Sequence, residues 1–359
     1  MSVTVAALGG TPLAAPRRTT TITDVADRAG VSASTVSRHL RGDTVRNAVT
    51  IDDAIQTLGF RPSRAAQALK SGRTGAIALV VPDITNPFFA AVVRGADSLS
   101  SAEGYTVFLS NTDESPEREA DVLEDLLGRV DGIILGPASE DDQNPLVVHR
   151  AGVPLVFIDR EIRGSGVDFD TVLVDNQGGA RQAVEHLVGL GHRRIAIVSG
   201  QLESTPGRER YEGFSAAIEA AGLDLPDAYV QFGAFREREA YQSMLRLLAL
   251  PEPPTAVFVG NNLMTIGALH AVRDMAIRVP DDLSIVGFDD HAFADLLAPP
   301  LTVVARPMEE QGVLAMRLLL NRIDGRGDAS PRRIVLDTTL TVRGSTSAPA
   351  VPQPRTRRR

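Results

Sequence analysis

Short apolar runs alternate with longer amphipathic patterns from about residue 74 to residue 343, and this alternation limits the possible folds more than any other feature. Runs such as Ala76–Val81 are continuously apolar, which is typical of parallel strands covered by helices on both faces. The alternation restarts near Thr171, so the sequence predicts two α/β lobes. The expected strands are 76–81, 106–110, 132–135, 155–158, 171–174, 195–198, 229–232, 256–259, 284–288, 302–306 and 333–342. The expected helices are 88–103, 116–129, 146–151, 178–190, 207–221, 237–250, 263–275 and 308–322.

The segment in front of the lobes predicts a small helical head at residues 21–61. Thr23 is the expected N-cap of a first helix, which Gly30 ends in a tight turn. Ser32 is expected to cap a second helix that runs to about Leu40. Two short helices joined by a glycine turn form a helix-turn-helix.

The second helix of the head has the side chains that DNA recognition requires. Its outer face is expected to present Ala33, Ser34, Ser37 and Arg38. Small side chains let a helix approach base edges in the major groove, and an arginine reaches guanine or a phosphate. The head core is expected to contain Val25, Ala26, Ala29, Val31, Val36 and Leu40. A third helix is expected from the apolar stripe of Ile51, Ala54, Ile55 and Leu58, and ends at Gly59.

Charge is divided unevenly along the 359 residues, whose formal net charge is −8. Residues 17–73 hold ten basic and five acidic side chains, a balance of +5. The chain from residue 74 onward holds 27 basic and 40 acidic side chains, a balance of −13. A basic head on an acidic body indicates a nucleic-acid-binding module with a second function behind it. Composition alone equally allows a basic linker without a partner.

Several classes of protein are excluded by what the sequence lacks. It contains no cysteine, which excludes disulfide scaffolds, thiolate metal sites and cysteine catalysis. No phosphate-binding loop, zinc pattern or nucleophile elbow occurs, so we expect no enzyme, no metal and no cofactor. The apolar runs are shorter than the ~20 residues of a membrane helix. Residues 1–16 lack the pattern of a signal peptide, so a cytoplasmic location is expected.

The residues that follow the expected strands predict a ligand-binding cleft. In open α/β sheets, ligands bind beyond the carboxyl ends of the strands. Polar and aromatic side chains follow the strands at 83–89, 159–160, 199–210, 260–262 and 289–290. Asp and Asn bond vicinal hydroxyls, Arg bridges two ligand oxygens, and aromatic rings cover an apolar sugar face. This combination predicts a sugar or a similar polyol as the ligand.

Two segments, ITDVADRAGVSASTVSR at 22–38 and LGFRPSRAAQAL at 58–69, resemble the LacI/GalR (lactose-repressor) family of bacterial transcription regulators. The resemblance covers about residues 21–345. It implies an α/β fold with an N-terminal helix-turn-helix head and a two-lobed, periplasmic-binding-protein-like body of parallel sheets. The loop at 42–50 is about three residues shorter than the common family pattern. His39 and Arg41 stand where the family more often has an apolar residue and an asparagine, and we expect His39 to contact a phosphate or lie exposed.

The resemblance implies that the head binds the major groove and that a hinge helix within residues 62–73 binds the minor groove. Leu69 would insert between central base pairs, with Ala66 packed alongside. The alternative is that Leu69 covers the core of the body. The implied DNA-binding residues are Thr23, Ser32, Ala33, Ser34, Thr35, Ser37, Arg38, Arg64, Ala66 and Leu69.

The resemblance also implies a set of effector-contacting residues at the strand ends. One of Phe88 and Phe89 is expected to belong to the core of the following helix instead, and Asn261 is expected as a helix N-cap, a ligand contact or both. The implied effector-binding residues are Asn86, Phe88, Phe89, Asp159, Arg210, Phe235, Asn261 and Asp289.

The expected domain division has disordered tails at residues 1–20 and 344–359, around a head, a hinge and a body at 74–343. The resemblance implies that the chain crosses between the lobes three times. We place these crossings near 159–164, 287–290 and 322–331. Lobe 1 then comprises 74–160 and 291–322, and lobe 2 comprises 161–290 and 331–343.

These features predict a ligand-responsive repressor. As a homodimer, it would bind a near-palindromic operator in double-stranded DNA, and a sugar-like effector would release it. A solute-binding protein of a transport system shares the two-lobed body, but it predicts a signal peptide and no helix-turn-helix. A structural DNA-bending protein would not need a ligand-binding body. The sequence leaves open which effector binds and whether it weakens or strengthens DNA binding.

Overall fold

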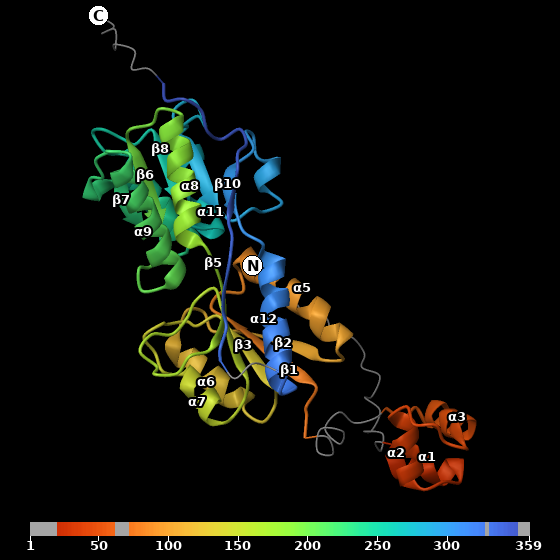
Figure 1. Cartoon of the computed structure of the whole chain (residues 1–359). Helices are drawn as coiled ribbons and strands as arrows, with labels where there is room; N and C mark the ends of the chain where they lie inside the picture. The colour runs from red at the N-terminus through yellow and green to blue at the C-terminus, as the bar shows by residue number, and fades with distance from the viewer. Residues whose placement is uncertain (1–19, 62–71, 327–329, 351–359) are drawn as a thin grey trace, which may run out of the picture. The chain divides into compact units, whose positions relative to one another are not determined.

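The computed structural model describes residues 20–61, 72–326 and 330–350. The chain divides into two compact units, residues 1–74 and 75–359, which are described separately below. The first unit contains the head, and the second contains the body with its two sheets (Figure 1).

The head consists of three helices, α1 (Ile22–Ala29), α2 (Ala33–Leu40) and α3 (Ala48–Leu58). The predicted caps Ser32 and Gly30 are confirmed, with Gly30 in the left-handed conformation at φ 66°. Thr23 is not the N-cap of α1, as was predicted. Thr21 takes that place, because its hydroxyl and the carboxylate of Asp24 form a reciprocal capping box. Three residues after Thr23 stands an alanine, which cannot complete such a box.

The core of the head is formed by apolar side chains from all three helices. Gly59 ends α3 with φ 58°, as predicted. Ala33, expected on the outer face, packs partly against this core instead. The fully buried members are Val25, Ala26, Val36, Ile51, Ala54 and Phe60, while Ala29, Val31 and Leu40 are partly buried.

The first sheet of the body belongs to the lobe that we call lobe 1. Its six strands are parallel, in the order β11-β5-β4-β3-β1-β2. Their bounds are β1 Ala76–Val81, β2 Thr106–Asn111, β3 Gly132–Leu135, β4 Leu155–Ile158, β5 Asp170–Val174 and β11 Arg333–Leu336.

The second sheet belongs to lobe 2 and has the order β12-β10-β9-β8-β6-β7. Its strands are parallel except β12, which pairs antiparallel with β10. Their bounds are β6 Ile195–Ser199, β7 Val230–Phe232, β8 Ala256–Val259, β9 Ser284–Phe288, β10 Thr302–Ala305 and β12 Thr339–Thr341.

Helices cover both faces of each sheet, as the continuously apolar strands predicted. In lobe 1, α5 (Pro87–Ala102) and α12 (Met308–Ile323) lie on one face, opposite α6 (Pro116–Leu126) and α7 (Pro145–Arg150) (Figure 1). In lobe 2, α8 (Asn176–Gly189) and α9 (Thr205–Ala220) lie on one face, opposite α10 (Glu237–Leu248) and α11 (Asn262–Asp274). Short 3₁₀ turns occur at Asp227–Tyr229 and Ala294–Leu296.

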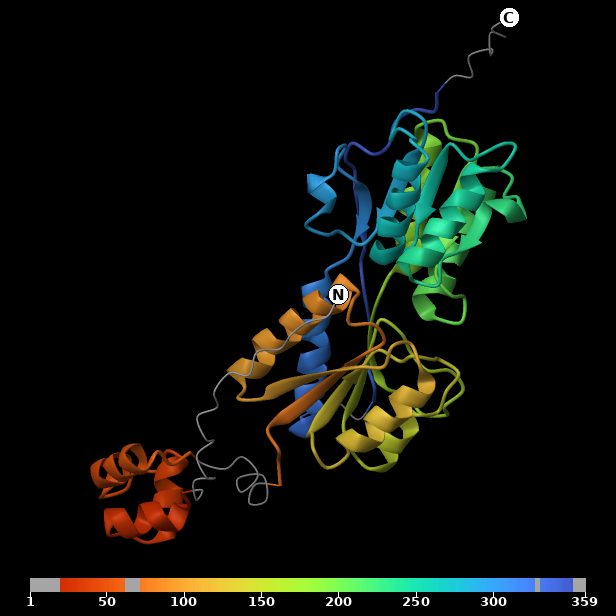
Figure 2. The ribbon, with the colours of Figure 1, turned by 180° about the vertical axis from the view of Figure 1, so that it is seen from behind.

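The three crossings between the lobes lie elsewhere than predicted. They follow β5 at Asp175, follow β10 at Arg306 and separate β11 from β12 at Asp337 (Figure 2). Lobe 1 therefore comprises 75–174 and 308–336, and lobe 2 comprises 175–307 and 337–350. An apolar run reveals a strand but not the sheet that it joins, so β5 and β10 were assigned to the wrong lobes. For the same reason, the single strand predicted at 333–342 is two strands in different sheets.

The end of the body is hydrogen-bonded to lobe 2 as far as Ser347, whereas the tail was predicted to be disordered from residue 344. Ser345 is 1% exposed, and its hydroxyl bonds Ile285 O at 2.6 Å and Thr302 N at 2.8 Å. His192 bonds the carbonyl of Ser347. Small hydroxyl side chains thus satisfy strand-end backbone groups that would otherwise be buried without partners. Residues 351–359 lie outside the described part of the chain.

Candidate functional site

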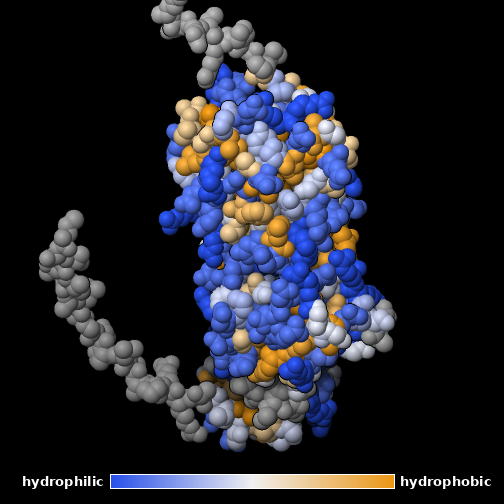
Figure 3. Space-filling view, turned by 90° about the vertical axis from the view of Figure 1, so that its left-hand side faces the viewer, coloured by the Kyte–Doolittle hydropathy of each residue, from blue (hydrophilic) through white to orange (hydrophobic). Residues whose placement is uncertain are grey.

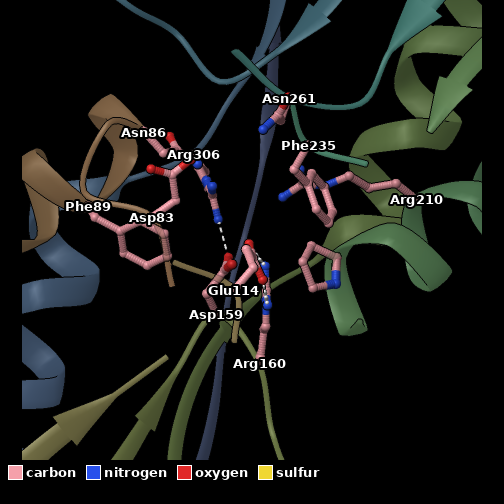
Figure 4. Close-up of a pocket in the computed structure, with 11 residues that line it drawn as sticks. Asp83, Asn86, Phe89, Glu114, Asp159, Arg160, Arg210, Phe235, Asn261 and Arg306 are labelled. Atoms are coloured by element: carbon pink, nitrogen blue, oxygen red, sulfur yellow. Dashed lines mark hydrogen bonds and ion pairs between the residues drawn. The ribbon is translucent and has the colours of Figure 1, made fainter. Parts of the chain in front are cut away.

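A cavity lies where strand ends of both sheets face each other, as the strand-end rule predicted (Figure 4). Its central free volume is about 20 Å³, which is room for about one water molecule. The side chains therefore nearly fill the cleft between the lobes. The lining residues are Asp83, Asn86, Phe89, Glu114, Asp159, Arg160, Pro206, Arg210, Phe235, Asn261 and Arg306.

Arg306, at the end of β10, joins the two lobes across this cavity. Its Nη1 lies 2.5 Å from Asp159 Oδ1 in lobe 1, and its Nε lies 2.6 Å from Asp289 Oδ1 in lobe 2. The guanidinium stacks 3.5 Å from the centroid of the Phe88 ring. Burial alone would lower the pKa of Arg306, but Asp289 and Asp159 outweigh it and raise the pKa. The group is therefore a permanently charged link between the lobes.

Arg210, on α9, is a buried arginine with a free hydrogen-bond donor. Its Nε bonds Asn176 Oδ1 at 2.8 Å, its Nη1 bonds the carbonyl of Gly260 at 2.5 Å, and it stacks on Phe288. Burial and then the charge of Arg306 lower its pKa to about 10. Within the described residues, Nη2 is buried and has no hydrogen-bond partner. An oxygen of a ligand would satisfy it.

Arg160 and Glu114 form a second buried ion pair, entirely within lobe 1. Both bonds of the pair are short, with Nη1 at 2.7 Å and Nη2 at 2.8 Å from the carboxylate oxygens. Burial alone would lower the pKa of Arg160, but Glu114 and then Asp159 raise it. The guanidinium lies 5.7 Å from the ring centroid of Phe235, so it supports one wall of the cavity.

Two asparagines combine helix capping with a position at the cavity. Asn261 caps α11 by accepting a bond from Met264 N at 2.8 Å, while its Nδ2 is buried without a partner among the described residues. Asn86 caps α5 and also accepts a bond from Nδ2 of Asn262 at 2.9 Å, which is a second link between the lobes. The sequence predicted both roles for Asn261; its ligand contact stays a prediction.

The backbone is strained at several residues of the site. Glu114, Asp159, Phe235 and Asp289 all adopt positive φ angles, between 57° and 81°. Non-glycine residues rarely take this conformation, and strain of this kind is concentrated at functional sites. Ion pairs with Arg160 and Arg306 hold the three carboxylates among them in place at that conformational cost.

Of the eight predicted effector-contacting residues, six line the cavity and two do not. Phe88 is fully buried beneath Arg306, as was expected for one of the two phenylalanines. Asp289 is 3% exposed and contacts Arg306 rather than the cavity. Glu114 and Arg306 were not predicted, although both follow strands of the sheets. The strand-end rule would have found Arg306 if it had also been applied to β10.

In the head, the predicted DNA-contacting residues of α2 differ in accessibility. Ser34 and Arg38 are exposed, whereas Ser37 is half-buried. The Nε of Arg38 lies 3.5 Å from Asp43, within the shortened loop. Thr35 bonds the Ser32 hydroxyl at 2.8 Å, and Thr23 is exposed on α1. The hinge residues Arg64, Ala66 and Leu69 lie outside the described residues.

His39 bonds the third helix rather than simply lying exposed, and its phosphate contact stays a prediction. Its side chain is only 18% exposed, and Nε2 lies 2.6 Å from Asp52 Oδ1 on α3. His39 therefore ties the second helix to the third, where the sequence predicted a phosphate contact or simple exposure.

Glu119, on α6, should make the stability of the body depend on pH. It accepts a bond from Ala138 N at 2.6 Å, and burial raises its pKa from 4.5 to about 7. Because the folded pKa lies above the unfolded one, the stability falls as the pH rises from about 4.5 to about 7, by about 3 kcal/mol. The difference between the melting temperatures at pH 5 and pH 8 should therefore be smaller in Glu119→Gln than in the unmodified protein. The exposed Glu124→Gln should behave like the unmodified protein, and a Glu119→Gln variant that kept the full pH dependence would contradict this assignment.

The described part of the chain lacks the features of two other classes of protein. No helix in this part of the chain is long and apolar enough to cross a membrane. No group of three or more His, Asp or Glu side chains in residues 20–61, 72–326 and 330–350 is arranged to hold a metal ion. Asp290, next to Asp289, turns away to pair with Arg343 at 2.8 Å, so the two carboxylates do not form a catalytic pair.

Comparison with known proteins places the chain in a family. Residues 21–63 match the family of bacterial regulatory proteins, lacI family, and residues 184–346 match the periplasmic binding protein-like domain. The ribose operon repressor of Escherichia coli K12 is 36% identical over 332 residues, which cover 90% of this chain and 99% of that repressor.

Solved structures agree with this placement over the whole fold. A complex of the transcriptional regulator CelR with cellobiose is 35% identical, with a TM-score of 0.71, and the match covers 91% of this chain and 99% of that one. The lac repressor dimer bound to operator and the anti-inducer ONPF is 28% identical, with a TM-score of 0.82 over 92% and 100% of the two chains. These relatives are transcription regulators, not enzymes. The chain belongs to the LacI family and is a DNA-binding transcriptional repressor with a periplasmic-binding-protein-like body.

Proposed function

We propose that this repressor leaves a near-palindromic operator when a sugar-like effector binds the cavity between its lobes. The observation that carries the proposal is the pair of buried, unpartnered donors at the cavity, Nη2 of Arg210 and Nδ2 of Asn261 within the described residues. Buried donors of this kind are rare in folded proteins unless a ligand or water satisfies them.

The other groups at the cavity suit a polyol. The carboxylate of Asp159 accepts hydrogen bonds from hydroxyl groups, while Phe89 and Phe235 offer aromatic surface to an apolar sugar face. The CelR relative was solved with a sugar, cellobiose, and is similar over 91% of this chain. These observations support a sugar or sugar derivative and leave its identity open.

Effector binding would act by shifting the arrangement of the two lobes. A cavity of about 20 Å³ is too small for a sugar, so its entry requires the lobes to separate or the Arg306–Asp159 link to open. An effector that prefers the rearranged lobes shifts the population toward them. The head would then lose affinity for DNA because its position in the dimer changes.

A homodimer is part of the proposal, because identical heads related by a two-fold axis bind identical half-sites. The lac repressor relative was solved as a dimer on its operator. The edge strand β2 exposes Phe108 and Leu109, by 53% and 41%, which suits a subunit interface.

The face of the body in Figure 3 is mainly hydrophilic with separate hydrophobic patches. Because a regulator of this kind works on the chromosome, a cytoplasmic location is part of the proposal.

A solute-binding protein is the other function that fits the body. It would bind a sugar in the same kind of cleft, and it would carry no DNA-binding head. The helix-turn-helix of α1 and α2, together with the family match at residues 21–63, favours the regulator.

Asp289→Ala is expected to remove the effector response while DNA binding persists. The change takes two hydrogen bonds from Arg306, whose guanidinium then loses its position in the cavity wall. Truncating one partner of a buried charge pair costs about 2–5 kcal/mol, so effector affinity should fall at least about 30-fold. Calorimetry measures this affinity with the ligand found by a thermal-shift screen of pentoses, hexoses, cellobiose and nucleobases.

The neighbouring residue provides the matched control for this variant. Asp290→Ala removes a carboxylate of the same loop that pairs with Arg343 outside the cavity, so effector binding should be kept. If Asp289→Ala bound the ligand as tightly as Asp290→Ala does, the cavity would not be the effector site.

A further inference from the structure

A buried glutamate provides a further link between the lobes, outside the lining of the cavity. Glu140 lies in lobe 1, in the loop after β3, and its side chain is fully buried. Its Oε1 accepts hydrogen bonds from the backbone N and the hydroxyl of Thr205, and its Oε2 lies 3.2 Å from Nη1 of Arg208. Both partners belong to the first turn of α9 in lobe 2. The N-terminus of a helix favours a negative charge, which adds to these bonds.

The loop that carries Glu140 is fixed to lobe 1 by its own hydrogen bonds. Glu119 accepts from Ala138 N, and Asn144 Nδ2 bonds the carbonyl of Pro116 at 2.7 Å. The carbonyl of Glu140 accepts from Arg163 N at 2.6 Å. The carboxylate is therefore held in place by lobe 1 and presented to lobe 2.

The hydrogen bonds of this carboxylate depend on the position of the second lobe. Within the described residues, the hydrogen-bond donors to this carboxylate all lie on α9, while Arg163 of lobe 1 approaches it at 3.8 Å. A buried carboxylate without donors is strongly disfavoured, so Glu140 must either keep the lobes together or be exposed to water. Because Glu140 is favourable only when it is bonded to α9 or exposed to water, the lobes should adopt two distinct arrangements and not a continuous range of positions.

We propose that Glu140 and the N-terminus of α9 form a latch that keeps the lobes closed without effector. Pro206, between the two donors, lines the cavity, so the latch lies directly at its wall. Glu140 is a positioning residue, since it is not among the residues that line the cavity. Opening the latch makes room for the effector and lowers the free energy needed to separate the lobes. The link to effector rests on the proposed function above, whereas lobe closure itself does not.

The test measures the distance between the lobes in the full-length protein without any ligand. The chain contains no cysteine, so Glu124→Cys on α6 and Glu219→Cys on α9 provide two exposed sites for spin labels. Pulsed electron resonance should give one narrow distance distribution for the otherwise unmodified chain. Glu140→Gln removes the charge facing Arg208 and should add a population at a different, longer distance, with the open-to-closed ratio raised at least tenfold.

Two further variants make the result decisive. Thr205→Val removes the hydroxyl donor but keeps the backbone donor, so it should shift the ratio in the same direction by a smaller factor. Glu185→Gln breaks an exposed pair with Arg181 inside lobe 2 and should leave the distribution unchanged. Unchanged distances in both Glu140→Gln and Thr205→Val would overturn the latch, and Thr205→Val alone decides if Glu140→Gln does not fold. If no sugar of the screen binds, the proposed function fails while this result still stands.

Discussion

Replacing Arg306 with alanine is expected to lower the free energy of unfolding of the body by about 3–5 kcal/mol and to abolish effector binding. The change leaves Asp159 and Asp289 buried without their counter-ion. One of these carboxylates would then have to take up a proton or become exposed to water. Thermal and urea denaturation measure the loss of stability, and calorimetry measures the loss of effector affinity.

The effect of Arg306→Ala can be separated from the loss of an ordinary arginine. Arg317→Ala, at an exposed position of α12, should change stability by no more than about 0.5 kcal/mol. Replacing Arg306 with methionine together with Asp159→Asn and Asp289→Asn should recover stability but not effector binding, because the charged groups of the cavity wall are lost. An Arg306→Ala protein as stable as Arg317→Ala would show that the charge network is not what joins the lobes.

Replacing Arg38 with alanine is expected to abolish operator-specific binding while effector binding persists. Arg38 is exposed on α2, where a guanidinium can make a bidentate contact with guanine. Each such contact is worth about 1–3 kcal/mol, so a dimer that loses it in both heads loses about 2–6 kcal/mol. Fluorescence anisotropy with an operator located by footprinting measures the change.

Two further variants show whether Arg38 acts through its charge or its shape. Arg38→Lys keeps the positive charge but not the planar fork of donors, so it should lose operator specificity and keep most non-specific binding. Arg181→Ala removes an exposed arginine of lobe 2 and should keep operator affinity. Unchanged operator affinity in Arg38→Ala would remove α2 from its assigned role as the recognition helix.

The sequence predicted the elements of the fold better than their connections. Strands such as Ala76–Val81 and Ile195–Ser199 were recognised because burial on both faces requires continuous apolar runs. The lobe crossings were misplaced because β5 and β10 are as apolar as their neighbours, and only pairing decides their sheet. Ser345 was missed because a polar segment with small side chains has the composition of a flexible tail, although its hydroxyl bonds backbone groups of the neighbouring strands β9 and β10.

The sequence predicted which residues line the cavity better than it predicted which side chains pair with each other. Asp159, Arg210 and Asn261 line the cavity as expected. Asp289 lies outside the lining and bonds Arg306, a pairing that was not predicted because the sequence does not show which arginine lies opposite which carboxylate. Glu140 could not be predicted either, because its partners lie 65 and 68 positions away on the other lobe.

The most direct test of the account is the affinity of the full-length protein for its operator with and without the sugar found by the thermal-shift screen. Anisotropy titrations should show that saturating sugar weakens operator binding by about 5- to 150-fold, the range of typical allosteric coupling. The same titration with Asp289→Ala should give one affinity under both conditions, while Asp290→Ala should respond like the unmodified protein. Equal operator affinity with and without bound sugar, or tighter binding with sugar, would contradict the claim that occupation of this cavity releases the repressor from DNA.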